Sequence, residues 1–435
     1  MMNSTEARDF YRDRFAQFEK DLNISQAWTR SVRREAISRF SELGFPSTGY
    51  EEWKYTNVRP ITEIPFELAE NRLNGVASEA LARLGIGNLA DNRLVFINGH
   101  YSPKLSSLRL PENIRVGNLA AVLSENPGGV EPYLARYASY QDQAFVALNT
   151  AWMNDGSFVY VPRGNVLREP IHLVFFSTAQ GEATVSYPRN LIVIGDESQA
   201  TVVETYLGVG NEVYFTNAVT EIVLGKNAVF DHYKLQRESD GAFHVATLQV
   251  HQDRSSNFSS HSISLGGALA RNDFNSVLDG EGSECSLNGL YMVDGKQHVD
   301  NHTRVDHMKP HCNSRELYKG ILDGKAKGVF NGKIYVHTAA QGTDAKQTNK
   351  NLLLSEDATI NTKPQLEIYN DNVKCTHGST VGQLDQDGLF YLRSRGIELK
   401  DARRLMTYAF ASEIIGQIKV AKLRTWLEET FQSRI

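Results

Sequence analysis

The chain has 435 residues, and its 41% of hydrophobic and 22% of charged residues are typical of a globular protein with two or three domains. A formal net charge of −5 gives no general attraction to nucleic acid or acidic membranes, so we exclude nucleic-acid binding. No run of about 18 apolar residues predicts a membrane span, and Met1 to Phe15 lack the apolar core of a signal peptide. We therefore expect a cytoplasmic protein. The three cysteines are far apart and form no C-x-x-C pair, which argues against disulfides and against a metal cluster held by this chain's cysteines alone.

The first part of the chain shows helical spacing over residues 4–43. Its apolar positions recur every three or four residues, at Trp28, Val32, Ala36, Phe40 and Leu43. We expect Arg33 and the neighbouring arginines to point away from this face, and Gly44 to end the helix. The segment 51–56 is interpreted as a loop pinned by Trp53, with a partner-binding surface as the alternative.

Short helices and one strand follow. Helical patterns cover Ala77 to Leu84, Leu119 to Leu123 and Ala144 to Met153, and the apolar run Leu94 to Ile97 predicts a strand that is closed by the turn Asn98-Gly99. Strand spacing replaces helical spacing near Asp155-Gly156. We therefore predict an N-terminal, mainly helical region over residues 1–154.

Residues 155–380 consist of short β-forming runs, separated by turns that resemble one another. One turn pattern recurs at 194–200, 224–228 and 354–358, and a second one recurs at 293–296 and 322–325. A degenerate turn that repeats through such a long β-rich region is typical of a β-solenoid, which we predict here, with a large sandwich or jelly roll as the alternative. The polar stretch from Thr343 to Asn351 suits side-chain ladders at the corners of the coils, or a surface loop.

Residues 381–435 return to helical spacing. Asp385 is expected to cap a first helix and Gly396 to end it. One longer helix is expected to follow, with an apolar stripe at Ala402, Leu405, Met406, Ala409, Phe410, Ile414, Ile418 and Ala421 that continues at Trp426, Leu427 and Phe431. Two interpretations remain open for this stripe: it docks onto the N-terminal helices of the same chain, or it binds a partner protein.

Two residues of the last predicted strand, Cys375 and His377, have metal-binding side chains. Because side chains alternate along a strand, both lie on one face, with Cα atoms about 6.5 to 7 Å apart. A thiolate and an imidazole at that separation can bind one metal ion, although no neighbouring residue completes a set of four ligands. A purely structural pair, or a thiol nucleophile with a histidine base, are the alternatives.

A second group of such residue types lies between Gln297 and Asn313. It comprises His298, His302, His307, His311 and Cys312, at spacings that match no zinc motif. We favour structural hydrogen bonding for this group over metal ligation. Cys285 has no basic neighbour and is expected to be a buried, inert thiol. The chain contains neither a P-loop nor a G-x-G-x-x-G turn after a strand, so we expect it to bind no nucleotide.

A family resemblance is carried by segments spread over almost the whole chain. These are Phe45-Pro46 and the segments 51–56, 297–303, 317–322, 347–353, 363–368, 374–378 and 389–396. Together they resemble the SufB/SufD family of the SUF iron–sulfur cluster assembly system. The chain lacks an N-terminal cysteine motif and a cysteine just before Pro364. In both respects it resembles the SufD branch of the family. The resemblance implies a right-handed parallel β-helix over 155–380, flanked by helical domains over 1–154 and 381–435.

The same resemblance implies a function. The chain would be a non-catalytic scaffold that pairs with SufB through the β-helix ends and holds one SufC ATPase on its C-terminal helices. His377, with Cys375 beside it, would contribute to a transient iron–sulfur cluster at the subunit interface. The residues that would dock SufC are Leu405, Met406, Ala409, Phe410 and Ile414. A homodimer of the isolated chain is a further possibility, and the competing interpretation is a β-helix enzyme acting on polysaccharide or on acyl groups.

Overall fold

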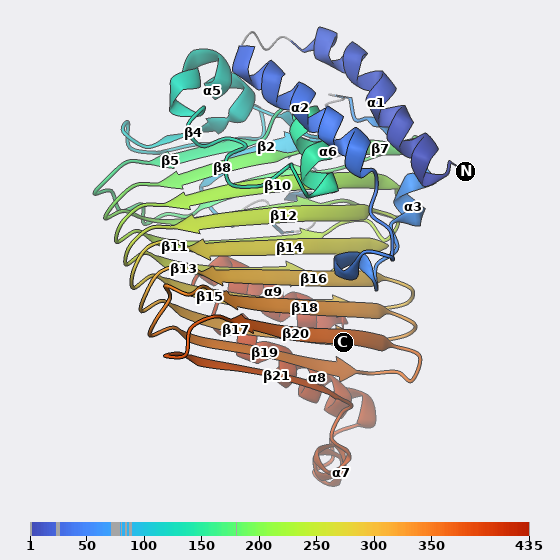
Figure 1. The fold of residues 1–435 in the computed structure, drawn as a ribbon. Helices are drawn as coiled ribbons and strands as arrows, with labels where there is room; N and C mark the ends of the chain where they lie inside the picture. Colours follow the sequence, from blue (N-terminus) through green and yellow to red (C-terminus); the bar gives the residue numbers. More distant parts are fainter. Residues whose placement is uncertain are drawn as a thin grey trace.

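The computed structural model describes residues 2–22, 27–70, 79, 81–82, 85–86, 89–179 and 181–434. A stack of parallel strands forms most of the molecule (Figure 1). Helices near the N-terminus lie over one end of this stack and the adjoining face. Helices near the C-terminus lie along the opposite face and at the other end. No described helix is both long and apolar enough to cross a membrane.

Successive strands alternate between two sheets. The first sheet contains β4 (Arg115–Asn118), β5 (Ser157–Val161), β8 (Arg189–Ile194), β10 (Tyr214–Leu224), β12 (Phe243–Gln252), β14 (Leu269–Leu278), β16 (His298–His307), β18 (Lys327–Val336) and β20 (Thr359–Ile368), with β1 (Glu67–Leu68) and β7 (Thr184–Ser186) beside β10. The second sheet contains β3 (His100–Tyr101), β2 (Asn92–Ile97), β6 (Ile171–Phe176), β9 (Gln199–Leu207), β11 (Val229–Arg237), β13 (Asn257–Ser264), β15 (Glu284–Val293), β17 (Asn313–Leu322), β19 (Asp344–Leu353) and β21 (Lys374–Gly382).

This arrangement is the predicted β-solenoid. From β8 to β19 each strand pairs in parallel with the strand two places later in the chain, as Phe258 with Cys285 and Lys327 with Thr359. Alternate side chains of the two sheets meet between them and form the main core, to which Phe230, Phe258 and Leu322 belong. The repeating turns reverse the chain through left-handed backbone conformations, for example at Asn227 with φ of 56°.

Helices cover the N-terminal end of the solenoid. They are α1 (Ser4–Asp21), α2 (Ala27–Leu43), α3 (Arg59–Thr62), α5 (Leu119–Glu125) and α6 (Ala144–Trp152), with short 3₁₀ turns at Glu51–Trp53 and Pro127–Gly129. Aromatic residues of α1, α2 and α6 pack on the outer face of the first sheet. Gly44 ends α2 in a left-handed conformation, as predicted. The prediction that Arg33 points away from the core is wrong, since it is buried and donates to the Met153 carbonyl at 2.7 Å.

The C-terminal helices are α7 (Gln386–Ser394), α8 (Leu399–Ile415) and α9 (Ala421–Arg434). Asp385 caps α7 through its side chain and Gly396 follows with positive φ, as predicted. The prediction of a single long helix over 402–431 is wrong: α8 ends at Ile415, and a short segment separates it from α9. Both helices pack on the outer face of the second sheet, where Ile414 and Leu427 share a core with Tyr233 and Leu290. Three residues of the N-terminal region, Leu81, Ile86 and Leu89, join the same core.

Candidate functional site at the open end of the solenoid

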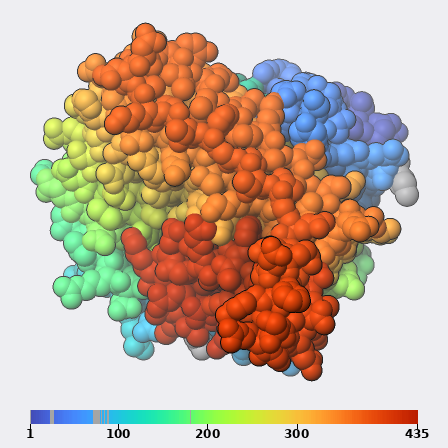
Figure 2. Space-filling view, turned by 90° about the horizontal axis from the view of Figure 1, so that it is seen from below, coloured from blue at the N-terminus to red at the C-terminus, as the bar shows by residue number. Residues whose placement is uncertain are grey.

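The C-terminal end of the solenoid has two long strands at its edge. β20 pairs only with β18, and β21 pairs only with β19, among the strands that the structure describes. Every residue of β21 from Thr376 to Gly382 is exposed. Figure 2 views the molecule from this end, with the last coils in orange and α7 in front. Free strand edges of this length are sites where another β-strand can pair.

The backbone of β21 presents unpaired hydrogen-bonding groups at this edge. The Lys374 N–H points toward β19 and donates to the carbonyl of Thr343, the residue just before that strand. In a parallel sheet, alternate residues direct both backbone groups to the same side. Cys375, His377, Ser379 and Val381 therefore direct their N–H and C=O groups away from β19, toward a strand that this chain does not supply.

The side chains of Cys375 and His377 share one face of β21, as predicted, and this face is toward the interior of the last coil. They lie opposite Ala345 and Gln347 of β19, which are buried. Cys375 is half-buried against an apolar cluster that includes Ile334 and Val336. Partial burial raises the pKa of Cys375, because an apolar environment disfavours the thiolate.

His377, in contrast, is exposed and stands over a polar column. Gln347 lies directly beneath it in the register of the sheet, and Glu316 lies beneath Gln347 in β17. Gln347 Nε2 donates to Glu316 Oε2 at 2.8 Å. Burial raises the pKa of Glu316 to about 7, because a carboxylate without a cationic partner is unfavourable in this interior. We did not predict this column from the sequence, although the alternation of side chains along β17 already directs Glu316 inward.

More polar side chains fill the rest of the last coils. The Thr362 and Ser379 hydroxyls lie 2.8 Å apart and connect β20 with β21. Asn351 Nδ2 donates to Asn349 Oδ1 at 2.6 Å. The polar stretch from Thr343 to Asn351 was expected at corners or in a loop, but residues 344–353 form strand β19, in which Gln347, Asn349 and Asn351 are buried and point inward. Hydrogen-bonding groups therefore line part of the interior next to the open end, beside the apolar cluster that contacts Cys375.

Cys375 and His377 find no third ligand in the described part of the chain. No group of three or more His, Cys, Asp or Glu side chains is placed there so that it could hold a metal ion. The two side chains can supply one sulfur and one nitrogen ligand. Any metal centre at this edge needs its remaining ligands from another molecule.

The second histidine group does not converge on one point. His298 and His302 lie on the outer face of the first sheet, His307 and Cys312 lie in the interior, and His311 lies in a turn. His298 Nε2 is 2.9 Å from the Thr56 hydroxyl, and His307 Nε2 is 2.9 Å from the Ser314 hydroxyl. These hydrogen bonds agree with the structural interpretation of His298 and His307. Cys285 is buried, and burial raises its pKa to about 12, as expected for an inert thiol.

His302 belongs to an ion-pair cluster that fixes the segment 51–56. Its two ring nitrogens lie 3.3 Å from Glu52 and 3.0 Å from Asp300. Asp300 also binds Arg271 at 2.8 Å, and the Arg271 guanidinium lies 3.8 Å from the Trp53 ring centroid. Trp53 pins this segment as predicted. Within this cluster the carboxylates of Glu52 and Asp300 are paired with the His302 imidazole.

The expected docking residues of α8 differ in their exposure. Leu405 is 49% exposed and Ala409 is also exposed, Met406 and Phe410 are half-buried, and Ile414 is fully buried against the second sheet. Three further apolar side chains reach the surface nearby in sequence: Phe390 (75% exposed), Tyr391 and Leu399. Sequence reasoning missed these three because it followed only the stripe of the longer helix.

Comparison with protein families gives two matches that together span most of the chain. Residues 5–173 match the SufBD protein N-terminal region, and residues 175–410 match the SufBD core domain of the SUF system for FeS cluster assembly. The border between the two matches falls inside β6, the second strand after the N-terminal helices.

Individual relatives match over almost their full length. An iron–sulfur cluster assembly SufBD family protein of Synechocystis is 36% identical, covering 92% of this chain and 90% of the relative. The iron–sulfur cluster assembly protein SufD of Escherichia coli is 33% identical, with 89% and 88% covered. The chloroplastic protein ABCI7 of Arabidopsis thaliana is 32% identical, with 90% and 83% covered.

Proposed function

Because this chain belongs to the SufBD family of iron–sulfur cluster assembly proteins, we propose that it acts as the SufD-type scaffold subunit of a SUF complex. In this proposal its open solenoid end pairs with SufB, and its C-terminal helices hold one SufC ATPase. His377, with Cys375 beside it, faces a nascent iron–sulfur cluster at the subunit interface. The cluster is the cargo of the complex, and the chain itself catalyses no reaction. The expected compartment is the cytoplasm.

The incomplete ligand pair on a strand with one free edge supports this proposal most strongly. Cys375 and His377 lie on the one strand of the second sheet whose edge has no neighbour at the C-terminal end. A partner strand at this edge would complete the backbone hydrogen bonds and bring further side chains next to His377. One contact would thus create both the interface and the missing ligands.

The surrounding residues suit a transient metal site. A neutral imidazole is a good ligand for iron, and its ring must be oriented by a hydrogen bond at the second nitrogen. Gln347 lies beneath His377 and is held in place by Glu316, so it is placed to orient the ring. Cys375 stays a thiol because burial raises its pKa, and loss of its proton would have to accompany binding of a metal. ATP-driven dimerisation of two SufC subunits would pull on the C-terminal helices and open the interface.

The pairing step can be tested with a proline at the free edge. In Val381→Pro the strand keeps its bonds to β19, because the Val381 N–H points to the open side, but it loses one donor for a partner strand. The chain should be co-expressed with the SufB and SufC of its own organism and purified through a tag on SufB. We expect about a tenfold weaker association of Val381→Pro with SufB, the loss of roughly one backbone hydrogen bond and its neighbours.

Val381→Thr is the matched control, because it keeps a β-branched side chain and the backbone donor. It should associate with SufB like the wild type. Full association of Val381→Pro, with an unchanged melting temperature of the isolated chain, would show that this edge does not pair with SufB.

A further inference from the structure

The apolar core of the solenoid is left open at one corner of the last coil. Two columns of apolar side chains end there: Leu366 follows Ile334, and Ile368 follows Val336, in the register of the sheet. Ile334 and Val336 are buried, whereas Leu366 is half-buried and Ile368 is 40% exposed. Each coil of a solenoid covers the coil before it. Leu366 and Ile368 therefore lack the coil that would cover them in the described part of the chain.

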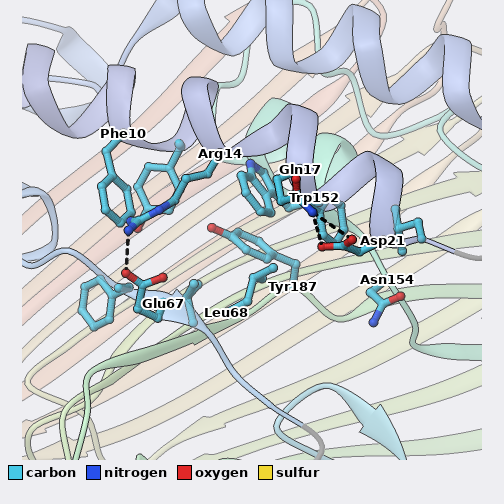
Figure 3. A pocket seen from close by; sticks show the side chains of 14 residues that line it. Phe10, Arg14, Gln17, Asp21, Glu67, Leu68, Trp152, Asn154 and Tyr187 are labelled. Atoms are coloured by element: carbon cyan, nitrogen blue, oxygen red, sulfur yellow. Dashed lines mark hydrogen bonds and ion pairs between the residues drawn. The ribbon is translucent and has the colours of Figure 1, made fainter.

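At the opposite end of the solenoid the chain covers its own apolar side chains. Helix α1 lies over the first coils, with the rings of Trp152 and Tyr187 beneath it (Figure 3). Trp152 stacks on Phe18 of α1 with a centroid distance of 4.7 Å, and Arg14 of α1 pairs with Glu67 of β1 at 2.9 Å. The apolar cluster at the open corner contains no residue of a described helix. A cover for this corner has to come from another molecule.

The open corner is continuous with the free edges of β20 and β21. The Tyr369 N–H donates to the Val336 carbonyl, so the alternate residues Leu366 and Ile368 direct their backbone groups to the free side. Cys375, at the start of the free edge of β21, belongs to the same apolar cluster as Leu366. A chain that pairs with β21 at Cys375 is therefore placed next to this corner.

Tyr369 gives the corner an exposed aromatic side chain. It follows β20 directly and is 55% exposed. Its ring centroid lies 5.2 Å from that of Tyr335, which in turn lies 4.5 Å from that of His337. These contacts hold Tyr369 in place before a partner binds, so little entropy is lost on binding, and tyrosine is frequent among the residues that dominate protein interfaces. The polar turn at residues 370–372 borders it like the rim of an interface.

We infer that Leu366, Ile368 and Tyr369 form an apolar docking site for an edge strand of the partner subunit, one with large apolar side chains at alternate positions. Such a strand supplies the missing cover, because its alternation places two apolar side chains on the face that meets Leu366 and Ile368. The inference rests on the proposed function, in which SufB is the partner. It adds a contact on the first sheet to the pairing of β21 in the second sheet.

Substitution of the exposed side chains tests the docking site in the complex purified through a tag on SufB. Ile368→Ser combined with Tyr369→Ser should weaken association with SufB at least about tenfold, because two apolar anchors are lost while the backbone edge of β21 is unchanged. Leu68→Ser combined with Val213→Ser is the matched control, since both residues are apolar and 38% exposed. It should associate like the wild type, and both double variants should keep the wild-type melting temperature.

Cys375 reports on the same corner without any substitution there. In the metal-free wild-type complex, iodoacetamide should modify Cys375 at least about tenfold more slowly than in the isolated chain, because SufB covers the cluster to which this thiol belongs. An unchanged rate in the complex would show that the corner stays open and would overturn the inference.

The outcomes separate this inference from the proposed function. If the wild-type chain does not associate with SufB, the proposed function fails and the inference fails with it. If the wild type associates and the folded Ile368→Ser, Tyr369→Ser variant associates equally well, only the inference is wrong. If that variant loses a homodimer of the isolated chain but binds SufB normally, the corner binds a second copy of this chain, which also contradicts the inference.

Discussion

The two metal-binding side chains of β21 lie in different surroundings although they are two residues apart. Cys375 packs against apolar residues, whereas His377 is exposed above the Gln347–Glu316 column. A thiol that is half-buried reacts slowly, because the thiolate is the reactive form. The exposed imidazole is accessible to a metal ion without any rearrangement. In the proposed function His377 therefore makes the first contact with the metal, and Cys375 can follow when a partner changes its surroundings.

Thiol reactivity gives a direct check of these surroundings. We expect iodoacetamide at pH 7.5 to modify only Cys375 in the native chain, and more slowly than a free cysteine, because its pKa is raised. Cys285 and Cys312 are buried and should react only after unfolding. Mass spectrometry of proteolytic peptides over time measures this, with Cys375→Ala as the control. Fast modification of Cys285 in the folded chain would contradict the packing described.

Glu316 predicts a pH dependence of stability. Its pKa in the folded chain is about 7, compared with 4.5 as the ordinary value. The folded state thus holds a proton that the unfolded chain releases between about pH 4.5 and pH 7, so the contribution of Glu316 to stability falls over that window and stays low above it. Glu316→Gln removes the titration. We expect this variant to be more stable than the wild type by about 3 kcal/mol at pH 8 and similar to it at pH 4.5.

Urea unfolding at the two pH values measures this difference, and Glu281→Gln on an exposed turn is the control. An equal stability difference at both pH values would show that folding does not raise the pKa of Glu316.

At the scale of elements, α7, α8 and α9 combine two tasks. Ile414 and Leu427 attach α8 and α9 to the outer face of the second sheet, while Phe390 of α7 and Leu405 of α8 remain exposed. An apolar side chain in the first group stabilises the chain itself, whereas one in the second group is available to a partner. Of the five residues expected to dock the ATPase, Ile414 therefore belongs to the chain's own core, and Leu405 is the best candidate for a contact.

Charge substitutions separate the two tasks. Phe390→Asp combined with Leu405→Asp should weaken association with SufC at least about tenfold, because apolar anchors supply much of the energy of such contacts. The melting temperature of the isolated chain should stay unchanged, since both side chains are exposed. Val166→Asp is the matched control, because Val166 on the solenoid is also exposed, and it should bind SufC normally. Undiminished SufC binding by the double variant would show that SufC does not dock on this surface.

The sequence predicted the elements better than their positions relative to one another. Alternation within single segments predicted the strands, the shared face of Cys375 and His377, and the cap at Asp385. Contacts between coils depend on the number of residues in each coil, which varies, so the alignment of Glu316 and Gln347 beneath His377 could not be predicted from one strand. The burial of Arg33 depends likewise on the distant Met153 carbonyl.

At the scale of the whole molecule, the two ends of the solenoid are finished differently. At the N-terminal end the short antiparallel strands β3 and β4 border the two sheets, and helices cover the neighbouring outer face. At the C-terminal end the long strands β20 and β21 have no further neighbour in the described chain. Solenoids need their ends capped, and a free end of this length is an aggregation risk unless a partner covers it. This asymmetry fits a subunit that is completed by pairing at one end only.

The central claim is that His377 contributes to the nascent cluster at this interface. The most direct measurement is the anaerobic reconstitution of the purified complex with iron and sulfide, followed through the visible absorbance of the cluster. His377→Ala should lose most of that absorbance while the complex still assembles, and Thr376→Ala, whose side chain points to the other face of the same strand, should reach the wild-type yield. A full cluster yield in the His377→Ala complex would contradict the claim.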